Sequence, residues 1–99
     1  MKSDWYLYMV RCYDGSLYTG ISTAVDRRFA QHQRQEGAGS KYLKGRGPLT
    51  LVFQTRLESR SLALKVESKV KKLSKGRKER LIGDSRYVEQ IVKRANWRF

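Results

Sequence analysis

The sequence predicts a single α+β domain: a small three-stranded antiparallel sheet flanked by helices, in the order β-β-α-β-α-α, with a last helix in a C-terminal extension. Three observations support this. The 99 residues suffice for one domain. Three short segments are rich in aromatic and β-branched residues, which favour strands. Elsewhere apolar residues recur at helical spacing. We therefore expect one domain over residues 1–99, with a core at about 4–82 and a helical extension at 83–99.

Residues 5–12 and 17–21 are the first two predicted strands, and the Asp-Gly turn between them indicates a hairpin. A two-residue loop would place Tyr8 and Tyr18 on opposite faces of the sheet. A three-residue loop with Gly15 in the left-handed conformation would place both tyrosines on one face, because side chains alternate along a strand. We favour the longer loop, since only there could the two tyrosines share one water molecule.

The first predicted helix opens at Thr23-Ala24-Val25-Asp26, which resembles a capping box with Asp in place of Glu, and runs to about Gln35. Arg28 and His32 are four residues apart and should lie together along one margin of its apolar stripe. The glycine-rich residues 36–48 are interpreted as a loop, and 49–54 as the third strand.

Three further helices are expected after the third strand. Their predicted bounds are Ser59 or Ser61 to about Leu73, Ser74 to Gly83, and Asp84 or Ser85 to about Asn96. On the first of these, three lysines gather on one outward side. Glu67 lies on the opposite margin of the apolar stripe, close to the core.

The charge is strongly asymmetric along the chain. The net charge is +13, and residues 41–99, with 17 basic and 5 acidic side chains, carry +12 of it. Such asymmetry favours a polyanionic partner, most simply nucleic acid. The candidate contacts are Lys41, Tyr42, Lys44, Arg46, Lys65, Lys69, Lys72, Lys75, Arg77 and Lys78.

Other classes of protein fit the composition poorly. No apolar run approaches the roughly 20 residues that span a bilayer, and the basic helices lack the aromatic anchors typical of a membrane-surface protein. The single cysteine, Cys12, suits a reducing cytoplasm and excludes an internal disulfide. We expect a cytoplasmic monomer or weak homodimer.

The residues that could carry chemistry resemble the GIY-YIG nuclease family. Tyr6-Leu7-Tyr8 stands where the family has Gly-Ile-Tyr, and Tyr18-Thr19-Gly20 where it has Tyr-Ile-Gly. Arg28 and His32 follow on the next predicted helix, and Glu67 on a later one. The stretch Arg11–Gly20 looks like the small stand-alone bacterial subfamily, in which this domain is nearly the whole protein.

The resemblance implies a metal-dependent endonuclease with one Mg²⁺ or Mn²⁺ ion held by Glu67. Tyr8 would be the general base and Tyr18 would orient the attacking water. Arg28 would contact phosphate, and His32 would move a proton, contact phosphate or only complete a helix face. A free tyrosine has a pKa of about 10, so Tyr8 would need a cationic neighbour, Arg28 or the metal, that lowers it.

The same resemblance leaves two points open. Gly20 either allows a close backbone approach or serves a turn. The family's Lys or Tyr before the third strand could be Lys41 or Tyr42, while its later Asn has no secure counterpart. No sequence-reading module is present, so we expect structure-specific or weakly specific cleavage of DNA, with DNA repair or processing as its setting. The alternative is a nucleic-acid-binding module that keeps the fold and cuts nothing.

Overall fold

A computed structural model describes residues 4–34 and 40–96. The elements are β1 (Trp5–Arg11), β2 (Leu17–Ser22), α1 (Val25–Gln33), α2 (Ser40–Leu43), β3 (Thr50–Leu57), α3 (Arg60–Lys71), α4 (Lys75–Gly83) and α5 (Ser85–Ala95). The strands form one antiparallel sheet in the order β2-β1-β3, which confirms the predicted α+β class with a three-stranded sheet.

The hairpin between β1 and β2 has the three-residue loop. Val10 pairs with Tyr18, and Tyr8 with Gly20. Gly15 has a φ of +85°, in the left-handed region that glycine tolerates, and its N–H donates to the Cys12 carbonyl at 3.0 Å. The expected register is therefore confirmed, and Tyr8 and Tyr18 project from one face of the sheet.

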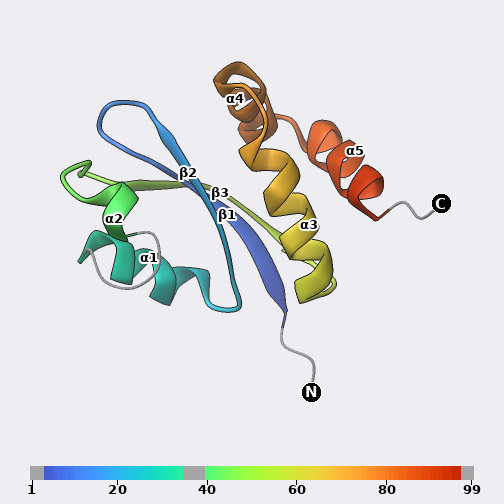
Figure 1. Ribbon diagram of the computed structural model, residues 1–99, viewed down its shortest axis with the longest axis horizontal. Coiled ribbons are helices and arrows are strands. Elements are labelled where there is room, and N and C mark those ends of the chain that lie inside the picture. Colours follow the sequence, from blue (N-terminus) through green and yellow to red (C-terminus); the bar gives the residue numbers. More distant parts are fainter. Residues whose placement is uncertain (1–3, 35–39, 97–99) are drawn as a thin grey trace.

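The sheet separates two groups of helices. Helices α1 and α2 lie on one side, and α3, α4 and α5 on the other (Figure 1). Leu7 and Met9 face the larger group and join a core with apolar residues of α3 and α5, such as Val66 and Ile91. Tyr8, Val10 and Val25 form a smaller buried cluster on the α1 side. The alternation along β1 thus gives both faces of the central strand a buried core.

Three local predictions differ from the structure. Helix α1 begins without the expected capping box: Ala24 is its N-cap, and the Ser22 hydroxyl accepts from the Ala24 N–H at 2.9 Å instead. Strand β3 continues to Leu57, because it pairs with β1 as far as Trp5. The stretch interpreted as a loop contains α2, whose Leu43 is buried and anchors it.

The N-termini of α3 and α5 decide between the pairs of candidate N-caps that the sequence left open. The Ser59 hydroxyl accepts from Leu62 N–H at 3.1 Å, so Ser59 rather than Ser61 caps α3. The Asp84 carboxylate accepts from the first turn of α5, so Asp84 rather than Ser85 caps it. In residues 4–34 and 40–96, no helix combines the length and apolarity that crossing a membrane requires.

Candidate active site

A cavity of about 310 Å³ lies along β2, at the edge of the sheet. Its lining comes from β1, β2, α1 and α3 and consists of Trp5, Tyr8, Tyr18, Gly20, Ile21, Arg28, Arg60, Leu64 and Glu67. Because β2 is an edge strand, a side chain from α1 and one from α3 can meet there although the two helices pack on opposite faces. Four of the five residues expected to be catalytic, Tyr8, Tyr18, Arg28 and Glu67, thus line one cavity.

Gly20 permits the side chain of Tyr8 to cross β2. A Cβ at position 20 would lie 2.7 Å from the Tyr8 hydroxyl oxygen and 2.8 Å from the ring carbon that bears it. Both distances are shorter than real Cβ contacts. Of the two interpretations open for this glycine, the structure supports the close approach, and the neighbour is the candidate catalytic side chain itself.

The Tyr8 hydroxyl is hydrogen-bonded to His32 in the protein interior. The Tyr8 oxygen and His32 Nε2 are 2.7 Å apart, and both side chains are buried. Burial raises the pKa of Tyr8, and the neighbouring Tyr18 raises it further, while Arg28 lowers it. Burial and Arg28 together lower the pKa of His32. At neutral pH both groups are therefore uncharged, and one proton lies between them.

The pKa of Tyr8 departs from the sequence-based expectation. A general base needs a lowered pKa, and Arg28 does act in that direction, but burial outweighs it. Burial likewise raises the pKa of Tyr18, and Glu67 adds to this. A stable tyrosinate is thus not the resting state of either residue. Proton removal by Tyr8 requires that it give up its own proton at the same time.

Glu67 fits the requirements of a hydrated hard cation. Its side chain is 18% exposed and receives an ion pair from Lys71 at 3.5 Å. Within the described part of the chain, no three His, Cys, Asp or Glu side chains gather as a metal cluster. Mg²⁺ binds through one or two carboxylates and keeps several waters, so one carboxylate that lines an open cavity suits this ion.

Two residues of α2 and its following turn reach the site. The Tyr42 ring lies 5.6 Å from the Tyr18 ring between centroids, and Arg46 lies over Tyr42 at 4.7 Å. Arg46 also donates to the Asp14 carboxylate at 3.0 Å, so its charge is partly engaged within the protein. Of the two candidates for the family's Lys or Tyr position, Tyr42 contacts the site through Tyr18, whereas Lys41 is exposed on α2.

The other basic residues are divided among surfaces. Lys65, Lys69 and Lys72 are exposed on the outer side of α3, as expected. Lys75 pairs with Glu79 at 3.4 Å. Lys69, Lys72 and Arg77 line a separate cavity against α5. Lys44 is exposed after α2, and Lys78 is half-buried on α4.

Sequence reasoning missed Trp5, Arg60, Ile21 and Leu64 in the cavity wall. The Arg60 guanidinium lies 5.7 Å from the Trp5 ring centroid, and both side chains line the cavity. Arg60, Leu64 and Glu67 are spaced by four and three residues and share one helical face. The helical spacing upstream of Glu67 would have identified Leu64 and Arg60. Trp5, in contrast, projects from the opposite face of the sheet from Tyr8, and no sequence pattern indicated that it lines the cavity.

The sequence that forms this site matches a known catalytic domain. The model of the GIY-YIG catalytic domain matches residues 4–80, which include β1, β2 and the Glu67 helix. The chain belongs to the GIY-YIG family. Its hairpin tyrosines, α1 arginine and α3 glutamate are the residues on which the resemblance rests, and a nuclease-like function follows from the domain.

Relatives within the family are small proteins of similar length. A UPF0213 protein of Cronobacter sakazakii is 56% identical over 79 residues, which are 80% of this chain and 81% of that protein. The UPF0213 protein YhbQ of Salmonella arizonae is 48% identical over 90 residues, 91% of this chain and 88% of that protein.

Two solution structures share the fold. A UPF0213 protein from Bacillus halodurans has a TM-score of 0.52 and 44% identity, covering 81% of this chain and 83% of that one. A protein from E. faecalis has a TM-score of 0.59 and 35% identity, covering 83% and 85%. The GIY-YIG assignment therefore extends to the small single-domain form of the family.

Proposed function

We propose that this GIY-YIG protein is a metal-dependent endonuclease that hydrolyses phosphodiester bonds in nucleic acid, most simply in DNA, with structural or weak sequence specificity. The observation that carries the proposal is the convergence of Tyr8, Tyr18, Arg28 and Glu67 on one cavity at the sheet edge. Hydrolysis needs an activated water, a cation for the charge on the phosphate, and help for the leaving oxygen. The cavity offers a candidate group for each requirement.

Tyr8 and His32 would act together on the attacking water. The tyrosine hydroxyl takes a proton from water while passing its own proton to His32 Nε2, 2.7 Å away. This relay avoids a free tyrosinate, which the raised pKa of Tyr8 disfavours. It requires a neutral His32, and burial lowers the pKa of that imidazole. Tyr18, on the same face, would orient the water.

Arg28 and Glu67 would act on the phosphate. The Arg28 guanidinium is a planar, permanently charged donor that suits phosphate oxygens. Glu67 would hold one Mg²⁺ or Mn²⁺ ion. When bound, such an ion polarises the scissile phosphate and stabilises the leaving oxygen. Lys71 pairs with Glu67 at 3.5 Å, so a bound cation would compete with this ion pair.

The proposal is tested with nicked, branched and single-stranded DNA, and with matched RNA, in Mg²⁺ or in EDTA. Cleavage should require the metal and be lost in Tyr8→Phe, while Lys93→Gln, which changes an exposed lysine of α5 outside the cavity, should keep it. Cleavage that survives EDTA, or survives Tyr8→Phe, contradicts the mechanism.

The charge of the molecule supports a second candidate, a nucleic-acid-binding module without turnover. In that case wild type would bind every substrate in the panel and cut none, and Tyr8→Phe and Glu67→Gln would leave the affinity unchanged. A role in DNA repair or processing is proposed with the first candidate.

A further inference from the structure

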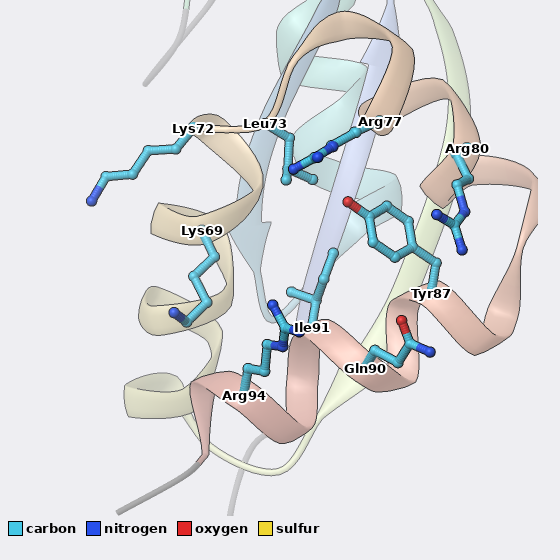
Figure 2. Close-up of a pocket in the computed structure, with 9 residues that line it drawn as sticks. All are labelled: Lys69, Lys72, Leu73, Arg77, Arg80, Tyr87, Gln90, Ile91 and Arg94. Atoms are coloured by element: carbon cyan, nitrogen blue, oxygen red, sulfur yellow. The ribbon is translucent and has the colours of Figure 1, made fainter.

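A second cavity, of about 440 Å³, lies where α3, α4 and α5 meet (Figure 2). Its lining consists of Lys69, Lys72, Leu73, Arg77, Arg80, Tyr87, Gln90, Ile91 and Arg94, hereafter the α3–α5 groove. Five of these nine side chains are cationic and none is acidic. Such a concentration of like charge lowers the free energy of a bound polyanion.

Most of these charges are not neutralised within the protein. Arg80 pairs with Asp84 at 3.5 Å. Lys69, Lys72, Arg77 and Arg94 take part in none of the ion pairs found among residues 4–34 and 40–96. By contrast, Lys71, Lys75 and Arg11 each face a carboxylate. These four cations of the groove, unlike Arg80, are therefore available to a ligand.

The floor of the groove is aromatic and apolar. Tyr87, Leu73 and Ile91 lie between the cations, and the Tyr87 hydroxyl points toward the α4 side of the groove in Figure 2. The Arg80 guanidinium lies over one face of Tyr87, 4.4 Å from the ring centroid. Basic groups around an aromatic side chain are the usual means of binding single-stranded nucleic acid, because the cations meet phosphates and the ring stacks on a base.

The size of the groove selects the form of the ligand. A cavity of about 440 Å³ falls in the range of sites for small molecules and admits a group of the size of a nucleotide. A base that is paired within a duplex cannot turn into it. A single strand, whose bases are free to turn inward, can enter it.

The groove and the active-site cavity lie on opposite sides of one helix. Glu67, Leu64 and Arg60 share one face of α3, and Lys69 and Lys72 fall on the other side at helical spacing. The surface of α3 between them is exposed and carries Ser68, with Lys65 and Lys72 toward the groove. A strand leaving the active site can therefore cross α3 over lysines and reach the groove.

We propose that the α3–α5 groove binds a single-stranded segment of the same nucleic acid that the active site cuts, with a base against Tyr87. This rests on the proposed function for the identity of the ligand. It adds a substrate class: nucleic acids with a single-stranded arm beside the cut, such as flaps and branched ends, rather than plain duplexes.

Two matched double variants test the groove. Lys69→Gln/Arg94→Gln removes one lysine and one arginine from it, and Arg86→Gln/Lys93→Gln removes the same charges from exposed positions of α5 outside it. Affinity for a fluorescent single-stranded oligonucleotide is measured in EDTA at several salt concentrations. The groove variant should lower the slope of log K against log salt by about 1.4, or about 0.7 per lost phosphate contact, while the control keeps the wild-type slope.

Amide NMR shifts locate the ligand independently of affinity. The oligonucleotide should shift Leu73, Tyr87 and Ile91, and an abasic oligonucleotide of equal length should bind more weakly and shift Tyr87 less. Equal losses in both double variants, shifts confined to other surfaces, or the same shifts from a polyglutamate peptide of equal charge would overturn the proposal.

The design separates this inference from the proposed nuclease. Because binding is measured in EDTA, it does not depend on cleavage. Groove binding with no cleavage by wild type on any substrate overturns the nuclease and supports the groove. Metal-dependent cleavage with unchanged flap preference in the groove variant supports the nuclease and overturns the groove.

Discussion

Replacing Gly20 with alanine tests whether the placement of Tyr8 matters for both stability and chemistry. The new Cβ would lie 2.7 Å from the Tyr8 hydroxyl oxygen, whereas ordinary contacts begin at 3.4 Å, so the ring must move by about 0.7 Å. The ring is buried and hydrogen-bonded to His32, so it cannot move without disturbing that bond. Overpacking of this kind costs about 1–3 kcal/mol.

Thermal unfolding and single-turnover cleavage measure the two consequences of Gly20→Ala. For a domain of this size, a loss of about 2 kcal/mol lowers Tm by about 8–16 °C. Cleavage by the folded protein should fall about 10²-fold, because a displacement near 1 Å at a reacting group has an effect of that order. Gly76→Ala is the matched control: nothing lies within 4 Å of its added Cβ, and it should be neutral or slightly stabilising.

A double variant separates the close contact from other causes. Adding Tyr8→Phe to Gly20→Ala removes the closest contacting atom and should recover part of the lost stability without recovering cleavage. Gly20→Ala with wild-type Tm and wild-type cleavage would refute the reasoning, because the close contact would then have no consequence.

Three further predictions follow from the described contacts. The buried Thr19 hydroxyl has no hydrogen-bond partner, so Thr19→Val should raise stability by about 1 kcal/mol in chemical denaturation, and a loss of stability would show that the hydroxyl is satisfied. Arg11 donates to Glu79 at 2.6 and 2.7 Å and lowers the pKa of Glu79 from 4.5 to about 2. A depressed carboxyl pKa stabilises the folded state above the unfolded pKa, so the Tm difference between wild type and Glu79→Gln should be constant above pH 5 and disappear between about pH 4.5 and 2; a difference that grows toward acid pH contradicts this. Because His32 must be neutral to accept a proton, the cleavage rate should rise with pH through a pKa below 6.5 and then stay level, and a rate that instead rises through the tyrosine range would indicate a tyrosinate base.

The sequence predicted the hairpin register because only one loop brings Tyr8 and Tyr18 to one face, and the structure confirms that register. It also predicted α3 with Ser59 among two candidate caps, since a hydroxyl next to a periodic apolar pattern is a strong local signal. These features depend on residues that are neighbours in the chain or in one hairpin.

Features that depend on distant packing were not predictable. Helix α2 has four residues and is anchored by the burial of Leu43. No local sequence pattern predicts that burial. The extension of β3 to Leu57 reflects pairing with Trp5, far away in the chain. The raised pKa of Tyr8 has the same origin, because burial depends on the packed fold, whereas the charge of Arg28 can be read from the chain.

The central claim is that the cavity at the β2 edge cuts nucleic acid, and single-turnover cleavage of a branched DNA in Mg²⁺ by wild type and by Glu67→Gln tests it most directly. Both proteins are used at concentrations that saturate the substrate, so that affinity does not enter. Cleavage by wild type and none by Glu67→Gln at equal occupancy is the predicted result. Equal cleavage by the two proteins, or none by wild type on any branched, nicked or single-stranded substrate, would contradict the assignment.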